Sequence, residues 1–567
     1  MHTLDWFVLI LTIVLIVSYG IWKGRHQTDA RSFLLSNNDM RWYTVCLSIM
    51  ATQASAITFL STPGQAFVDG MGFVQFYFGL PIAMVILSIT AVPNYFRLKV
   101  FTAYEFLESR FDVKTRSLAA FLFLIQRGLG AGLTIYAPSL ILSVILGWDI
   151  VWTNLIIGSL VVLYTTTGGS RAVSWTQSHQ MLVIFLGMTA AAVTVLLRLP
   201  PDISFRDTLH LAAQMNKLNL VDFSLDPDNR YTIWSGLLGG LFLQLSYFGT
   251  DQSQVGRYLT AQSITQSRLG LLCNGLVKIP MQFLILFLGV LVFVFYLFVT
   301  PPLHFNPINV DAVRQGSSAA AYADLESEYE MVHRQRQQTL RRVLSSESGA
   351  VAVLENQNSQ MQAIREDAQQ LISEADPGAS VIDTNFIFLT FVLNFLPVGL
   401  VGLVIAAILA ASMSSTSSEL NALASTTVVD VYKRLIRRQR PGTEGTGKHE
   451  LLVSRVATFL WGVVAIGFAE FAGALGSLIE AVNILGSLFY GTILGIFLAA
   501  FYVRKIGGTS VFAGALLAEA IVIWCYNYTS ISFLWYNVIG CVGVILLSLV
   551  IDPIIKKTAT SKKDAAA

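Results

Sequence analysis

The sequence predicts an all-α polytopic membrane protein with about 13 transmembrane helices. Hydrophobic residues make up 54% of the 567 residues and charged residues only 13%, whereas soluble globular chains carry about 25% charged residues. The apolar residues form runs close to the roughly 20 residues that a helix needs to cross a bilayer. The net charge of +2, without a long basic stretch, argues against nucleic-acid binding. The predicted spans are 5–22, 43–68, 73–95, 116–146, 150–167, 175–197, 233–253, 270–299, 386–420, 451–474, 477–503, 509–528 and 531–551.

The first run is predicted to be a retained helix, because polar residues and Arg25, Arg31 and Arg41 follow it without an A-x-A-like cleavage site. Every second loop is basic, and Lys556 and Lys557 follow the last span. Positive charge marks cytoplasmic loops. We therefore expect the N-terminus outside and the C-terminus inside, in the plasma membrane (the inner membrane of a Gram-negative bacterium), with membrane lipid as a partner.

The stretch 301–385 interrupts the spans with residues rich in Glu, Gln, Arg and Ala. Apolar residues recur at helical spacing on both sides of Gly349, which predicts an extracytoplasmic helical hairpin. The hairpin is either a rigid cap or a docking surface for a protein partner at 312–376. The predicted segments are 1–42 (leading helix and cytoplasmic loop), 43–300 (core helices 1–7), 301–385 (insert), 386–505 (core helices 8–10) and 506–567 (two accessory helices and a basic tail).

The four cysteines lie inside apolar runs and lack the spacing of metal ligands. We expect them to be reduced packing residues. They are Cys46, Cys273, Cys525 and Cys541.

Two spans carry polar side chains at mid-depth, where such groups are tolerated only beside a cavity or a partner. Thr52, Gln53 and Ser55 lie in the second span, and Gln244 and Tyr247 lie in the seventh. Broken spans in matching positions of two halves are typical of inverted-repeat transporters with a site at the midplane. The alternative is that these side chains form ordinary hydrogen bonds between helices.

A third polar span reads "LVIAAILAASMSSTSSELNALAS". Ala411, Ser414 and Ser415 stand at i, i+3 and i+4, and therefore on one helix face. Two hydroxyls beside carbonyls freed by a broken helix make an uncharged cage of oxygens, which suits a hard monovalent cation such as Na⁺. The alternative is that the serines only allow close helix packing.

The sequence resembles the sodium:solute symporter family, which includes proline, glucose, iodide, monocarboxylate and sialic acid carriers. The resemblance covers nearly all of 1–550 and rests on ordered motifs. These are "SIMATQASAITFLSTPG", "TAYEFLESRFD", "IYAPSLILSVILGWD", "TGGSRAVSWTQSHQ", "FGTDQSQVGRYL" and "AASMSSTSSELNALASTTVVDVYKR". The family implies a LeuT-type core of two inverted five-helix repeats, here spans two to eleven, with one helix before it and two after.

The resemblance also implies the residues of a sodium site. Ala51, Ala54 and Ala411 would supply backbone carbonyls, and Ser414 and Ser415 would supply hydroxyls. Na⁺ is then the coupling ion.

One position departs from the family pattern. The family motif "W-T-D" reads "W-T-Q" here, with Gln177 in place of an acid that serves a second sodium site in some members. Ser417 and Ser418, which could serve that site, are present. Because the second ion would lack a carboxylate, we expect one Na⁺ per transport cycle.

Substrate contacts are implied by similarity to the sugar and proline branches. Tyr247 matches an aromatic that closes the pocket, and Asn483 matches a substrate-binding amide. Interhelical hydrogen bonding is the alternative for each polar residue. The candidates are Gln53, Thr58, Gln75, Tyr77, Gln244, Tyr247, Lys278 and Asn483.

Two cations stand at membrane depth, Arg127 and Lys278. Because buried charges face a cavity or a partner, and an arginine fork suits carboxylates, Arg127 predicts an anionic organic substrate such as a sugar acid. In the alternative, Arg127 pairs with Glu480 or Asp251 and the substrate is neutral. Lys278 either lines the pocket or extends to the cytoplasmic face.

The sequence thus predicts a symporter that imports a small organic solute with Na⁺ by alternating access. An enzyme is disfavoured because the seven histidines are scattered and most acids lie in the insert and loops. The other alternative is a transporter-like sensor that acts through a partner at the external hairpin.

Overall fold

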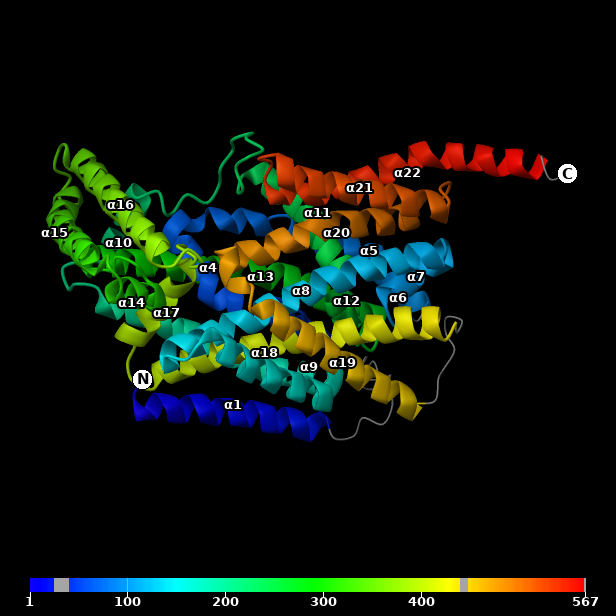
Figure 1. Cartoon of the computed structure of the whole chain (residues 1–567), viewed down its shortest axis with the longest axis horizontal. Helices are drawn as coiled ribbons and strands as arrows, with labels where there is room; N and C mark the ends of the chain where they lie inside the picture. The colour runs from blue at the N-terminus through cyan, green and yellow to red at the C-terminus, as the bar shows by residue number, and fades with distance from the viewer. Residues whose placement is uncertain (25–39, 99, 439–446, 565–567) are drawn as a thin grey trace.

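The computed structural model describes residues 1–24, 40–98, 100–438 and 447–564 (Figure 1). Over these ranges the regular elements are helices, with one isolated β-bridge between Met40 and Ala261. Ten helical segments within them are long and apolar enough to cross a membrane, and two shorter apolar helices accompany them. The all-α prediction is therefore confirmed. Parts of the basic loops, including Arg25 and Arg31, lie outside the described residues.

Most helices run along the long axis of the molecule, with the two chain ends toward opposite ends of that axis (Figure 1). As far as residue 298, the helices are α1 (Thr3–Gly24), α3 (Trp42–Gln53), α4 (Ala56–Asp69), η2 (Gly70–Tyr77), α5 (Leu80–Ile89), α6 (Ala91–Leu98), α7 (Ala103–Arg110), α8 (Val113–Leu146), α9 (Ile150–Arg198), α10 (Phe205–Gln214), η3 (Ser235–Gly239), α11 (Gly240–Gly249), α12 (Gln252–Leu259) and α13 (Ile264–Phe298).

The second half begins with the insert and ends with two long C-terminal helices. Its elements are α14 (Pro307–Gln315), α15 (Ala319–Leu344), α16 (Ala350–Ala375), α17 (Thr384–Phe395), α18 (Leu400–Thr426), η4 (Thr427–Ile436), α19 (Gly447–Ala469), η5 (Ala472–Leu475), α20 (Leu478–Tyr502), α21 (Gly508–Tyr528) and α22 (Phe533–Asp564).

Both predicted helix breaks are confirmed. Helix α3 ends at Gln53 and α4 begins at Ala56. Likewise, α11 ends at Gly249 and α12 begins at Gln252. Between α3 and α4, Ala54 has a ψ of 79°, outside the helical range. Each break leaves backbone groups without helical partners, and at membrane depth other groups must satisfy them.

The predicted span 386–420 is divided between α17 and α18. Pro397 restricts the residue before it to extended conformations, and Leu396 has φ −72° and ψ 147°. The apolar run continues through this turn, so hydropathy alone did not reveal it.

The predicted spans 150–167 and 175–197 both lie in α9. The Tyr164 and Thr176 hydroxyl oxygens are 2.7 Å apart, although twelve residues of straight helix would extend about 18 Å. Helix α9 therefore bends sharply between its two apolar parts.

Helix α13 packs against α3 and α4, the two halves of the first broken span. A Cβ atom on Gly289 would lie 2.2 Å from the carbonyl oxygen of Pro63 in α4. A larger residue would push the helices apart, so the small residue permits the close approach.

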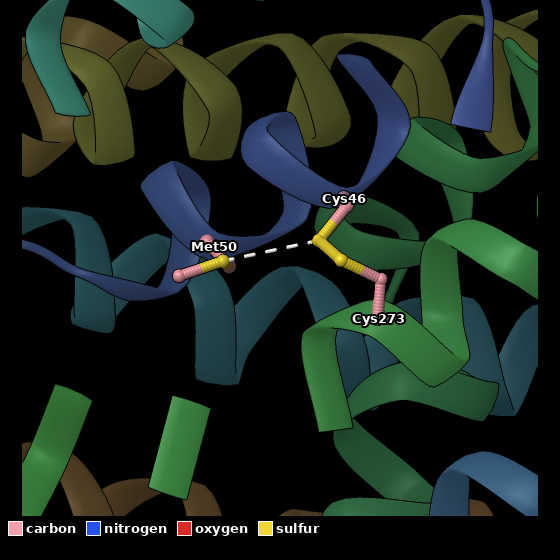
Figure 2. The surroundings of a disulfide bond; sticks show 3 residues. All are labelled: Cys46, Met50 and Cys273. Atoms are coloured by element: carbon pink, nitrogen blue, oxygen red, sulfur yellow. Dashed lines mark hydrogen bonds between the residues drawn. A yellow bond between two sulfur atoms is a disulfide. The ribbon is translucent and has the colours of Figure 1, made fainter. Parts of the chain in front are cut away.

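The prediction of four reduced cysteines is wrong for one pair. Cys46 on α3 and Cys273 on α13 form a disulfide, with their Cα atoms 5.9 Å apart and Met50 beside the bridge (Figure 2). The two residues are 227 positions apart, so their contact could not be predicted from local sequence patterns. Cys525 and Cys541 are buried free thiols, as expected.

The insert forms the predicted hairpin of α15 and α16, which turns at Gly349 with a φ of +82°. It lies at the end of the molecule that also carries the N-terminus (Figure 1). Tyr329 and Ile364 belong to an apolar cluster inside the hairpin. The Gln337 amide donates to the Phe298 carbonyl at 2.7 Å, which ties the hairpin to the end of α13.

The disulfide predicts a pattern of thiol labelling. A maleimide added to protein denatured without reductant should label two thiols, those of Cys525 and Cys541, and after reduction it should label four. Cys46→Ser should release Cys273 and give three labelled thiols without reductant. Intact-mass spectrometry measures the count, and four labels on the unreduced wild type would contradict the bridge.

Candidate functional site

The break between α3 and α4 frees two carbonyls. In a continuous helix the N–H groups of Ser55 and Thr58 would bond to the carbonyls of Ala51 and Ala54, four residues back. Instead, Ser55 donates to the Gln53 carbonyl at 3.1 Å, and Thr58 donates to the Ser55 carbonyl at 3.0 Å. The carbonyls of Ala51 and Ala54 are therefore available to another donor or to a cation.

Helix α18 brings a hydroxyl to this break. The Ser414 hydroxyl donates to the Ala51 carbonyl at 3.1 Å. The Ser415 hydroxyl donates to the Ala411 carbonyl at 3.1 Å, so these two also share a face. Ser414 and Ser415 are at most 2% exposed. This donor set is buried, uncharged and made of oxygen, and its chemistry fits a hard monovalent cation.

Gln177 on α9 joins the neighbouring polar side chains into an uncharged network. Its amide oxygen accepts from the Ser48 hydroxyl at 2.6 Å, and its amide nitrogen donates to Ser418 at 3.0 Å and to Thr52 at 3.2 Å. The Ser417 hydroxyl donates to the Ser414 carbonyl at 3.0 Å. An amide thus connects α3, α9 and α18 at the position where the family pattern has an acid.

A cavity of about 90 Å³ lies beside both helix breaks. Seven of the nine predicted substrate residues line this cavity, and they come from α3, α4, η2, α8, α11 and α20. The seven are Gln53, Thr58, Tyr77, Arg127, Gln244, Tyr247 and Asn483.

Arg127 on α8 is the centre of a buried ionic network. Its guanidinium pairs with Glu419 of α18 at 3.0 Å and with Asp251, which lies at the break between α11 and α12. The Tyr490 hydroxyl accepts from Arg127 at 2.6 Å and donates to Asp251 at 2.9 Å. The Thr134 hydroxyl donates to Glu419 at 2.9 Å. One cation and two carboxylates make this cluster.

The pairing of Arg127 matches one of the two predicted partners. Asp251 is a partner, whereas Glu480 pairs with Arg230 at 2.5 Å. The Nε atom of Arg127 is buried without a hydrogen-bond partner among the described residues. The guanidinium therefore keeps its Nε–H free while it lines the cavity.

The sequence of the chain also matches a known protein family. Residues 33–328 and 371–518 match the sequence model of the sodium:solute symporter family. The chain belongs to the sodium:solute symporter family. The symporter is therefore a transporter and not an enzyme, it is a multi-pass protein of the plasma membrane, and it couples the movement of a small organic solute to Na⁺.

Curated relatives are similar along most of the symporter. It is 26% identical over 525 residues to sodium-coupled monocarboxylate transporter 1 of Xenopus laevis, covering 92% of this chain and 71% of the relative. It is 26% identical over 526 residues to the sodium-dependent multivitamin transporter of Oryctolagus cuniculus, covering 92% and 70%. The human sodium/iodide cotransporter is 32% identical over 297 residues, covering 52% and 45%.

A solved structure shares the fold. A Na⁺-coupled sialic acid symporter in a substrate-bound, outward-open state superposes with a TM-score of 0.75 and 22% identity, covering 98% of each chain. The helices of the symporter thus adopt the LeuT-like arrangement of Na⁺-coupled transporters.

Two predicted substrate residues lie outside the cavity of the symporter. The side-chain amide of Gln75 is hydrogen-bonded to backbone groups. Its nitrogen donates to the Tyr231 carbonyl at 2.7 Å, and its oxygen accepts from the Asp222 N–H at 3.0 Å. Lys278 is fully buried on α13 and does not extend to the cytoplasmic face, with its ammonium 5.8 Å from the Tyr77 ring. It therefore stands behind the cavity wall.

Glu419 and Tyr490 are the functional candidates that the sequence analysis missed. Glu419 could have been found, because it is an acid in an otherwise uncharged apolar run, and such residues mark sites. Tyr490 carries no comparable signal, since a tyrosine in an apolar helix is ordinary. Its role is visible only from its contacts with Arg127 and Asp251.

The ionic network predicts a large effect of removing its cation. Arg127→Met leaves two buried carboxylates without a partner, which should lower the stability of the purified symporter by about 3–5 kcal/mol. Adding Glu419→Gln should recover part of the loss. The apparent melting temperature in detergent measures both effects.

The matched control is Arg334→Met, whose side chain is 73% exposed in a surface pair. Its effect should stay within about 0.5 kcal/mol. Equal melting temperatures for wild type and Arg127→Met would show that the network does not support the fold.

Proposed function

We propose that Na⁺ binds between the α3–α4 break and α18, with the carbonyls of Ala51, Ala54 and Ala411 and the hydroxyls of Ser414 and Ser415 as its ligands. The observation that carries this proposal is the pair of carbonyls that the break frees of helical hydrogen bonds. The Ser414 hydroxyl already contacts one of them. A cation there satisfies backbone groups that have no water to bind at membrane depth.

We infer that one Na⁺ moves in each cycle. A second site near Ser417 and Ser418 would need an anionic partner, and the residue at that position is the neutral Gln177. Its amide nitrogen donates to Ser418 and Thr52, so the hydroxyl oxygens there face a positive partial charge. That arrangement supports a hydrogen-bonded network in place of a second ion.

The solute site in this proposal is the cavity beside both breaks, with its polar lining as the ligand contacts. The amide oxygens of Gln53 and Gln244 and the Nε atom of Arg127 are buried and unpaired among the described residues. A polar solute would satisfy them. Pockets that hold drug-sized ligands have volumes of about 300–1,000 Å³, and this cavity of about 90 Å³ is smaller, so a solute as large as a sugar acid would require the lining helices to move apart.

We propose that the solute is a small carboxylate or sugar acid. Relatives named for monocarboxylates and for iodide carry anions, which supports an anionic solute. Since Arg127 already faces two acids, the solute carboxylate would bind its free N–H and compete with Asp251 for the guanidinium. A neutral solute, with Arg127 purely structural, is the alternative.

Alternating access follows from the same contacts. The bond between Arg127 and Asp251 joins α8 to the α11–α12 break, and Ser414 joins α18 to the α3–α4 break. In this proposal Na⁺ stabilises the junction at Ser414, whereas a solute carboxylate that competes with Asp251 weakens the junction at Arg127. The two ligands together then favour an arrangement in which the Ser414 junction is formed and the Arg127–Asp251 junction is opened. The resulting population shift is limited by the difference in their affinities for the two states.

The membrane arrangement is also a proposal: 13 spans with the N-terminus outside and the C-terminus inside, and the five segments bounded at residues 42, 300, 385 and 505. Opposite positions of the chain ends support it (Figure 1). So do exposed apolar side chains such as Leu163 and Leu197, which would face lipid. A protein partner at 312–376 stays a prediction.

Removing one ligand hydroxyl tests the sodium site. Ser414→Ala and Ser415→Ala should each raise the Na⁺ concentration for half-maximal uptake at least tenfold, because a contact to a charged group contributes about 1.5–3 kcal/mol. Proteoliposome uptake at varied Na⁺ measures this. Ser425→Ala, on the same helix but bonded only to backbone of its own turn, is the control and should match wild type. Unchanged Na⁺ activation in both test variants would refute the assignment.

The charge of the solute is tested with a matched pair of ligands, lactate and lactamide, which differ in the carboxylate. Arg127→Lys should weaken the apparent affinity for lactate at least fivefold more than the apparent affinity for lactamide. The reason is that the substitution removes the guanidinium fork but keeps a cation. The ratio of the two apparent affinities corrects for any general damage to the protein. A ratio equal to that of wild type would favour the neutral alternative.

A further inference from the structure

A second and larger cavity lies between the insert and the core. Its volume is about 760 Å³, within the usual size of small-molecule sites. Asn358 and Gln362 of α16 line one side, and Phe67 of α4 and Phe293 of α13 line the other. The hairpin therefore forms one wall of the cavity and the transporter core forms the other.

Arg336 of α15 is a buried cation in the wall of this cavity. It is 7% exposed, and among the described residues it forms no ion pair. Its guanidinium makes two long contacts, to the Asn358 side-chain oxygen at 3.4 Å and to the Tyr296 carbonyl at 3.5 Å, and its Nε atom has no partner. Buried arginines are normally paired, so this guanidinium lacks an anion.

The other charged groups of the wall are already compensated or lie in solvent. Arg365 pairs with Asp383 at 2.8 Å, and the Lys217 ammonium lies 4.8 Å from the Phe293 ring. The carboxylates of the lining, Glu355 and Glu366, belong to exposed residues. Burial lowers the pKa of Arg336 to about 10, which leaves it charged near neutral pH.

We propose that this cavity binds a small organic carboxylate, with its carboxylate on Arg336 and its apolar part against Phe67, Phe293 and Tyr296. The planar guanidinium presents a fork that matches a carboxylate. The aromatic side chains supply the apolar wall that organic ligands prefer. Bound there, the carboxylate supplies the charge partner that the protein does not.

This site is separate from the transport cavity, and its Arg336 and α16 wall lie outside the part of the chain that the family model covers. Helix α4 lines both cavities, with Thr58 at one and Phe67 at the other, about 14 Å apart along the helix. Between them Gln65 donates to Glu480 at 3.5 Å. The family match stops at residue 328 and resumes at 371, so Arg336 and the α16 wall belong to the insert.

The test is calorimetric titration of purified full-length protein with benzoate in sodium-free buffer, which disfavours occupancy of the Na⁺-coupled site. Wild type should bind benzoate, Arg336→Gln should weaken binding at least tenfold, and Arg336→Lys should weaken it less. Arg334→Gln, two residues along α15 but exposed and paired with Glu330, should change it less than twofold. No binding by wild type, or equal binding by Arg336→Gln, would overturn the proposal.

A second variant keeps the Arg336 guanidinium and reduces the volume of the cavity. Ser359→Trp, at an exposed position of the lining, should also weaken benzoate binding. Its Na⁺-dependent uptake in proteoliposomes should stay at the wild-type level, which checks that the variant is folded. Asn483→Ala, in the lining of the transport cavity, should leave benzoate binding unchanged. Loss of binding in Asn483→Ala would place benzoate in the transport cavity and overturn the proposal. Arg336-dependent binding of inorganic phosphate without benzoate binding would overturn the choice of an organic ligand.

Discussion

The break between α3 and α4 is the constraint on which the rest of the structure depends. A helix interrupted inside a membrane exposes carbonyls to a medium that cannot solvate them. In this protein Ser414 of α18 donates to one freed carbonyl, and the polar side chains of α18 line up behind it. Close packing of α13 on α4 through Gly289 holds the broken span in place. The same arrangement that satisfies the backbone also gathers the oxygen atoms of the proposed Na⁺ site.

The proposed ion site carries no charged side chain, whereas the network around Arg127 contains one cation and two carboxylates. The proposed ion cage is neutral, so the ion brings the only full charge to it. The acids and Arg127 are gathered instead at the α11–α12 break, where a guanidinium faces Asp251 and Glu419. In the proposed mechanism this division lets the two broken helices respond to different ligands, a cation at one and a polar solute at the other. The fold joins them through α18, which carries both Ser414 and Glu419.

Features set by local sequence were predictable, and features set by distant contacts were not. Polar side chains in apolar runs located both breaks. The spacing of the α18 residues put Ala411, Ser414 and Ser415 on one helix face, and the family resemblance implied that this face meets the first break. The pairing of Arg127 was left between two acids, because choosing needed the packing of α8 on the α11–α12 break. The Cys46–Cys273 bridge, the burial of Lys278 and the backbone role of Gln75 depend on neighbours far along the chain.

The position of the bound ion can be observed by diffraction. Thallium replaces alkali cations and scatters strongly enough to be seen by anomalous diffraction from crystals of the full-length protein grown with thallium in place of sodium. We expect one peak between the carbonyls of Ala51 and Ala54 and the hydroxyls of Ser414 and Ser415, which added Na⁺ should remove. A peak beside Asp251 and Glu419, with none at the α3–α4 break, would contradict it.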